Sequence, residues 1–105
     1  MLDLDKYLND GVDIKLFGKE VTLKMLTYKD TVEIGKLEEE MRKEDITAEK
    51  ANDIRAKITL IMLNNNAQNV KFDINQIKNK MPVKLQVALA NQVAKFIYKL
   101  ENDPN

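Results

Sequence analysis

The sequence predicts an α+β fold, mostly α, in which an N-terminal β-hairpin packs on a bundle of three to four helices. Apolar residues alternate with polar ones within residues 12–26, whereas from residue 28 onward they recur at spacings of three or four. These two periods are those of a strand and of a helix. A length of 105 residues suits one domain with a single core, so residues 1–105 are predicted to form one domain.

The hairpin is expected at residues 12–26, where two alternating runs flank a short connection. Gly18 in this connection can adopt the positive φ that a tight turn requires. Successive side chains of a strand point to opposite faces, so the apolar residues of both runs should share one face. That face comprises Val12, Ile14, Leu16, Val21, Leu23 and Met25. Upstream, residues 2–8 are expected to form a short helical turn.

Four helices are expected after the hairpin, at residues 28–43, 48–64, 74–80 and 82–101. The first carries a narrow apolar stripe among many charges, and Gly35 within it is interpreted as a position of close packing. The second has a broad apolar stripe and should form the core, with Ile58 and Ile61 buried. Residues 101–105 are expected to form a frayed tail.

Capping residues predict where these helices begin and end. Thr27 and Thr47 each precede a helix and offer a side-chain oxygen as N-cap. Asp73 lies three residues before Gln76, which is the spacing of a capping box. Residues 64–66 are three asparagines and should end the second helix, because Asn tolerates the left-handed conformation. Proline at position 82 suits the first turn of the last helix.

The last helix carries two adjacent apolar stripes, which together exceed the arc of about 100° that a single packing contact needs. The first stripe is expected to anchor the helix to its own core and contains Leu85, Leu89, Val93, Phe96, Ile97 and Leu100. The second stripe is the candidate partner-binding surface and contains Val87, Ala90, Ala94 and Tyr98. Burial between two elements and contact with another chain both explain such a wide apolar arc.

The composition argues against an enzyme. The chain has no cysteine and no histidine, which removes thiolate nucleophiles, Cys-based metal sites and the commonest general base near neutral pH. Glu38, Glu39 and Glu40 are adjacent, but consecutive helical residues point about 100° apart, so their carboxylates should not converge. The glycines are isolated and form no phosphate-binding loop. We therefore expect no catalytic residue, no cofactor and no metal.

Charge is unevenly distributed although the formal net charge is zero: residues 1–52 are net acidic and residues 53–105 net basic. A solvated helical surface is the simpler interpretation of the basic half. The alternative is a small nucleic-acid-binding regulator or adaptor of a mobile element, with residues 74–101 as a helix-turn-helix. Against it, the last helix begins Pro82-Val83-Lys84-Leu85, which lacks the polar side chains that contact base edges.

Membrane insertion is not expected from the sequence. No apolar run approaches the roughly 20 residues of a membrane span. The N-terminus, MLDLDKYLNDG, mixes acidic with apolar residues, whereas a signal peptide begins with a basic region followed by an apolar one. A cytoplasmic protein is therefore predicted.

The order of a hairpin, the LTYKDTVEIGKLEE helix, a long apolar helix and a DINQIKNKMP step into a terminal helix resembles small tail assembly chaperones of long-tailed bacteriophages and prophages. In that family, strands around a Gly-Lys or Gly-Glu turn lead through a Leu-Thr step into the first helix. The corresponding positions here are Ile14, Leu16, Gly18, Lys19, Val21, Leu23, Leu26 and Thr27. The similarity covers most of residues 12–100.

This resemblance implies a non-enzymatic protein in the cytoplasm of the bacterial host. Such a chaperone keeps the tape measure protein soluble and helps to recruit tail tube subunits around it. The hairpin adds one expectation of its own, because the edge of a two-stranded sheet exposes unpaired backbone groups. That edge is available to a strand from a second copy, by self-association, or from a client.

Overall fold

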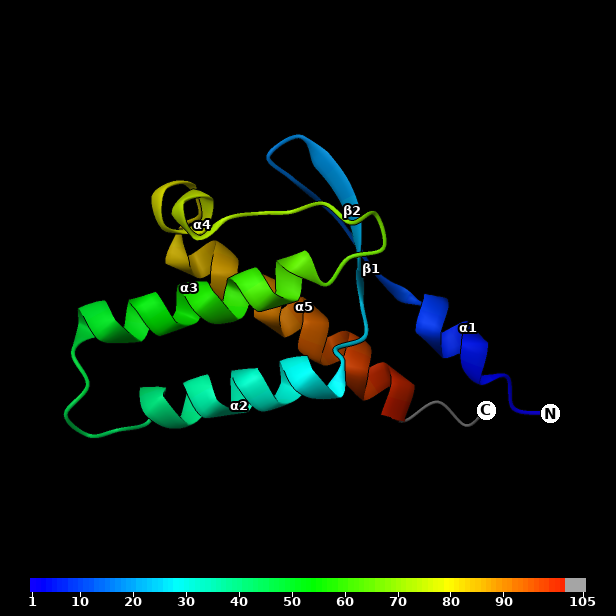
Figure 1. The fold of residues 1–105 in the computed structure, drawn as a ribbon, viewed down its shortest axis with the longest axis horizontal. Coiled ribbons are helices and arrows are strands. Elements are labelled where there is room, and N and C mark those ends of the chain that lie inside the picture. The colour runs from blue at the N-terminus through cyan, green and yellow to red at the C-terminus, as the bar shows by residue number, and fades with distance from the viewer. Residues whose placement is uncertain (102–105) are drawn as a thin grey trace.

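The computed structural model describes residues 1–101, and its elements follow the predicted order (Figure 1). They are α1 (Leu4–Asn9), β1 (Gly11–Leu16), β2 (Lys19–Lys24), α2 (Tyr28–Met41), α3 (Ala48–Asn64), α4 (Ile74–Lys80) and α5 (Val83–Glu101). The predicted fold class is confirmed, because a two-stranded antiparallel hairpin precedes four substantial helices. Each of these helices begins and ends within two residues of its predicted range. Residues 102–105, most of the expected tail, lie outside the described residues.

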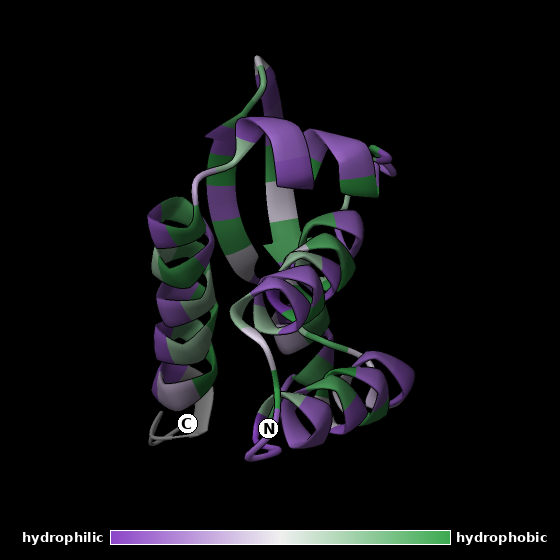
Figure 2. Cartoon of the chain, turned by 90° about the vertical axis from the view of Figure 1, so that its left-hand side faces the viewer, coloured by the Kyte–Doolittle hydropathy of each residue, from purple (hydrophilic) through white to green (hydrophobic). Residues whose placement is uncertain are grey.

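Helix α3 lies at the centre of the fold and contacts α2, α4, α5 and β2. In Figure 2, α5 stands beside α3 and apart from α2. The core has two parts, and α3 contributes to both. The larger part lies under the hairpin and includes Val21, Leu23, Leu63, Phe72, Ile77 and Leu89. The smaller part lies between α2 and α3 and consists of Ile34, Ile54 and Ile58, with half-buried neighbours.

The hairpin has the register that its two-residue turn dictates, with Ile14 opposite Val21 and Leu16 opposite Lys19. Phe17 and Gly18 form the turn with φ values of 52° and 77°, the double positive φ of the turns that match strand twist. The ring of Phe17 packs against that of Phe72, with centroids 6.3 Å apart. The predicted apolar face is confirmed for the strand residues, because Val12, Ile14 and Leu16 are half-buried against the core that contains Val21 and Leu23. Met25 lies beyond the end of β2 and does not belong to this core.

The three asparagines at the end of α3 act differently from the prediction. Asn65 caps the helix with a φ of −90°, so the chain does not turn there through the left-handed region; that conformation occurs later, at Asn69. The side chain of Asn64 instead donates to the carbonyl of Phe72 at 3.2 Å and accepts from its N–H at 2.8 Å. Asn66 makes the same pair of bonds with Val70, at 2.8 and 2.9 Å. These amides thus fold the following loop back onto the end of α3.

The loop after α3 also covers one edge of the hairpin. The N–H of Lys24 donates to the carbonyl of Asn65 at 2.9 Å, and that of Ala67 donates to the carbonyl of Thr22 at 3.0 Å. Asn66 forms an isolated antiparallel bridge with Leu23. The expectation of an unpaired hairpin edge is therefore wrong for β2, because residues 65–67 take the place of a third strand.

The predicted N-caps are confirmed. Thr27 Oγ1 accepts from the N–H of Asp30 at 3.2 Å, and Thr47 Oγ1 accepts from that of Lys50 at 3.1 Å. Both hydrogen bonds of the capping box between Asp73 and the third helical residue are present. These bonds satisfy backbone donors that the first turn of a helix leaves without a partner.

Two predictions about burial are wrong. A Cβ atom at Gly35 would meet nothing within 4 Å, so this glycine serves no close packing. Ile58 is buried at 9 % exposure, but Ile61 is only half-buried, on the margin of the smaller core. The most enclosed side chain near the end of α3 is instead Leu63, at 0 %, because it faces the hairpin and α5.

We expect truncation of Leu63 to test this assignment of the core. Leu63→Ala removes a fully enclosed side chain and should lower the free energy of unfolding by about 2–5 kcal/mol. Ile61→Ala, the matched control on the same helix, should cost less than half as much because its side chain is only half-buried. Urea denaturation measures both values, and equal losses would contradict the burial described above.

Gly35 and Gly18 should respond oppositely to alanine. Gly35→Ala fills open space within α2 and should raise the free energy of unfolding by about 1 kcal/mol, through the higher helix propensity of Ala. Gly18→Ala places a side chain at a φ of 77° and should lower it by about 1–2 kcal/mol. Thermal and urea unfolding report both changes. A destabilised Gly35→Ala variant would show that this position makes a contact that the structure lacks.

Candidate partner-binding surfaces

An open apolar groove runs between α2 and α5, with α3 as its floor. It has a volume of about 350 Å³ and exists because α2 and α5 both pack mainly on α3. Its apolar lining includes Ile34 and Met41 from α2, Ile58 and Met62 from α3, and Val93 and Ile97 from α5. A groove with two helical walls, a helical floor and small residues at its rim has the form that takes up an apolar segment of another chain.

Two polar side chains of this groove, Gln86 and Arg55, differ in their hydrogen bonding. Gln86, at 5 % exposure, is hydrogen-bonded through both ends of its amide: its Nε2 donates to the carbonyl of Met81 at 2.9 Å, and its Oε1 lies 3.2 Å from the hydroxyl of Thr59, which also donates to the carbonyl of Arg55 at 2.9 Å. The Arg55 side chain differs, because its Nε atom is buried without a hydrogen-bond partner among the described residues. Leaving a buried donor unpaired costs about 1–3 kcal/mol, so a hydrogen-bond acceptor that entered the groove would relieve this cost.

The four residues of the predicted partner-binding stripe do not form one surface. Ala90 and Ala94 line the groove, on the α5 wall. Val87 is half-buried and lines no part of it, and Tyr98 is 68 % exposed. Of the neighbouring stripe, Leu89 and Val93 are buried and Ile97 is half-buried against the core, whereas Leu85 is 45 % exposed. The side chain of Leu100 lies outside the described residues.

Sequence reasoning missed the contributions of α2 and α3 to this groove. Glu38 faces it from α2, and Arg55 faces it from α3. The sequence places Glu38 in a highly charged stretch that suggests only a solvated surface, and Arg55 is an isolated basic residue in the helix that was expected to form the core. The spacing of apolar residues along one helix reveals that helix's faces. It carries no signal about which other helix will stand across from each face.

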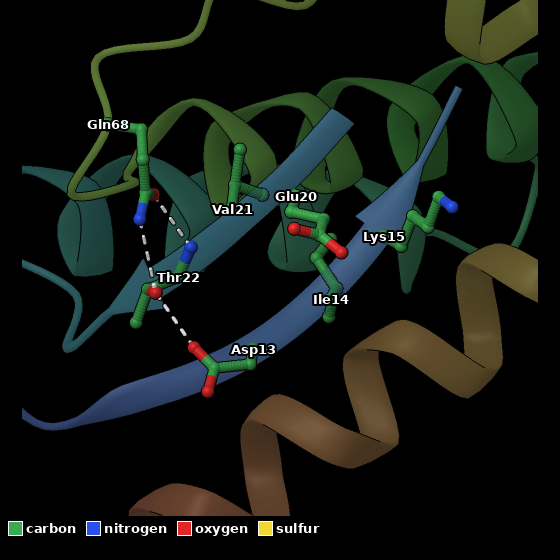
Figure 3. A pocket seen from close by; sticks show the side chains of 7 residues that line it. All are labelled: Asp13, Ile14, Lys15, Glu20, Val21, Thr22 and Gln68. Atoms are coloured by element: carbon green, nitrogen blue, oxygen red, sulfur yellow. Dashed lines mark hydrogen bonds between the residues drawn. The ribbon is translucent and has the colours of Figure 1, made fainter. Parts of the chain in front are cut away.

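A second, polar hollow lies on the hairpin, between its strands and Gln68 of the loop after α3 (Figure 3). The hydroxyl of Thr22 donates to Asp13 Oδ1 at 2.7 Å, and Gln68 Nε2 donates to the same hydroxyl at 3.3 Å. Gln68 Oε1 also accepts from the N–H of Thr22 at 2.8 Å. Because these groups bond to one another, the network fastens the loop after α3 to β2, and we assign it a structural role.

The acidic run of α2 is spread over the helix surface. Glu40 forms an ion pair with Lys50 of α3 at 3.4 Å, whereas Glu38 lies at the groove. Among the side chains that the structure describes, those of residues 1–99, no group of three or more potential metal ligands comes together. The expectation that this protein binds no metal stays a prediction.

The basic half of the chain is partly engaged in the fold. Lys78 of α4 pairs with Asp53 of α3 at 3.1 Å. Val83 and Leu85, in the first turn of α5, are exposed apolar side chains at 43 % and 45 %. This is the turn that a helix-turn-helix protein directs towards base edges. The structure therefore offers no specific observation in favour of a nucleic-acid-binding regulator.

Comparisons of the chain with protein-family models, with curated proteins and with solved structures found no match. In the part of the chain that the structure describes, none of the helices combines the length and the apolar character that crossing a membrane requires.

Arg55 should reduce the stability of the free protein. Arg55→Met keeps an unbranched stem but removes the unpaired donor, so the free energy of unfolding should stay the same or rise by about 1 kcal/mol. Arg55→Ala, the control, also loses the packing of the stem and should be less stable than Arg55→Met. Urea denaturation distinguishes the two. A loss above about 1 kcal/mol in Arg55→Met would mean that the guanidinium has a partner in solution.

Proposed function

We propose that this protein is a non-enzymatic tail assembly chaperone of a phage or prophage, which binds the tape measure protein and keeps it soluble. In this proposal it also helps to recruit tail tube subunits. The observation that carries the proposal is the open apolar groove between α2, α3 and α5 with its unpaired buried donor. The order of elements that resembles such chaperones supplies the identity of the client.

The groove suits one kind of client segment. Ala90 and Ala94 on its α5 wall are small enough to let a client helix approach closely without exposing a large apolar patch in the free protein. An apolar side of that helix would cover the groove, and a carboxylate or carbonyl oxygen near its edge would accept from Arg55. A tape measure protein, which is long and aggregation-prone, offers many segments of this kind.

Chaperoning by this groove needs no chemistry beyond reversible burial. The groove holds one acidic and one basic side chain, Glu38 and Arg55, and no ion pair between them occurs in residues 1–101. Both can therefore orient a client segment by its charges, which sets register more than affinity.

The test is co-expression with a tape measure protein from the same genome, followed by solubility and pull-down measurements. Ala94→Asp puts a charge on the groove wall at an exposed position, so the variant should fold normally but recover at least tenfold less client. Arg55→Met should weaken recovery without loss of stability. The matched control is Ala48→Asp, the same substitution at an exposed site in the first turn of α3, where a carboxylate is favourable.

Two results would count against the proposal. Full client recovery by a folded Ala94→Asp variant would exclude the groove as the binding site. Failure of the unmodified protein to bind or solubilise the tape measure protein would exclude the chaperone function itself. Circular dichroism and melting curves of each variant establish that it is folded.

A further inference from the structure

The two edges of the hairpin differ in their backbone hydrogen bonding. The outer edge of β2 bonds to the loop after α3 through the N–H of Lys24 and both the N–H and the carbonyl of Thr22. In an antiparallel pair, directly opposed residues either both point their backbone groups at each other or both point them away. Thr22 and Lys24 point away from β1, so their opposite residues, Asp13 and Gly11, point away from β2.

The same alternation applies to Lys15, two residues after Asp13. The backbone N–H and C=O groups of Gly11, Asp13 and Lys15 therefore form a row along the outer edge of β1. Among residues 1–101 these groups have no backbone partner. Such a row is a template for one more strand.

An apolar groove with a volume of about 230 Å³ lies directly beside this open edge. Helix α5 runs along the side of β1 that is turned away from β2 (Figure 3). The groove is lined by Ile14 and Leu16 from the strand, by Met81, which caps the end of α4, and by Leu85 and Ala88 near the start of α5. Leu85 is 45 % exposed there, so apolar surface and unpaired backbone groups occur at the same place.

We propose that the open edge of β1 binds an extended segment of a partner polypeptide as an added antiparallel strand. Its backbone would bond to Asp13 and Lys15, and alternate side chains would enter the groove on α5, so these must be apolar. The side chains between them would face solvent beside Asp13 and Lys15. Charge complementarity then calls for an acidic residue opposite Lys15, followed two residues later by a basic residue opposite Asp13.

A segment of another protein fits this edge better than a second copy of the whole chain. An added strand would lie over α5, which borders β1 on that side. If a second copy paired through its own β1, its α5 would lie on the same side of the shared sheet as the first α5. The two helices would then compete for the same space. This inference does not depend on the proposed chaperone function, because the two use different surfaces. The edge of β1 lies beside the groove that contains Leu85 and Ala88, called here the groove on α5. The chaperone function uses the groove between α2 and α5 that has α3 as its floor, called here the groove on α3.

The test uses a synthetic peptide, acetyl-TVEIKVT-amide, and ¹⁵N-labelled protein. The sequence places apolar residues towards α5 and the glutamate and lysine opposite Lys15 and Asp13. Saturable shifts of the amide signals of Gly11, Asp13 and Lys15 are expected at millimolar peptide. N-methylation of the glutamate and lysine amides, which would bond to β1, should weaken binding at least tenfold. N-methylation of the isoleucine amide, which points away, is the matched control and should leave binding unchanged.

Protein variants locate the site. Lys15→Pro removes an N–H that does not bond to β2, and Ala88→Asp charges the groove on α5; each should weaken peptide binding at least tenfold while the fold is retained. Ala94→Asp, which affects only the groove on α3, should bind the peptide normally, so this test and that of the chaperone function fail separately. Absence of shifts with the unmethylated peptide, or equal binding of all methylated forms, would overturn the proposal. So would concentration-dependent shifts of the same amides without peptide, because they would assign the edge to a second copy.

Discussion

The fold depends on the way the loop after α3 is held by side-chain amides. A loop that lies against a core must pair its backbone groups, because each one left unpaired costs as much as a lost hydrogen bond. Asn64 and Asn66 supply these partners within the chain, to Phe72 and Val70 respectively. The loop can therefore lie on the hairpin and bring Phe72 and Ile77 into the larger core. These amides thus act together with the buried side chain of Ile77 and the ion pair between Lys78 and Asp53 to place α4 on α3.

The same loop decides which surfaces of the protein are open. By pairing with β2 it closes one edge of the sheet, and the edge of β1 remains beside α5. Helix α3 has a comparable effect on the other side of the molecule. Because it contributes Ile54 and Ile58 to the smaller core and Ala56 and Leu63 to the larger one, it separates α2 from α5. The groove on α3 is the space that this central position leaves.

The residues of this groove were only partly predictable. Ala90 and Ala94 belong to an apolar stripe that the sequence of α5 reveals by its spacing. Tyr98 belongs to the same stripe but is exposed, because the stripe extends along α5 beyond the residues that line the groove. Arg55 carries the one unpaired buried donor among the described residues. An isolated arginine in a helix gives no sign of burial, since its long stem reaches water in most settings.

Local chemistry in the sequence determined the elements of this protein. Alternation between polar and apolar residues specified the hairpin, Gly18 its turn, and Thr27, Thr47 and Asp73 the starts of three helices, because each effect acts within a few residues. Tertiary structure alone decided what Asn64 and Asn66 bond to, which edge of the hairpin stays open, and which face of α5 lies across from α2. These features depend on contacts between residues far apart in the chain, and the periodicity of one segment contains no record of the segment that will pack against it.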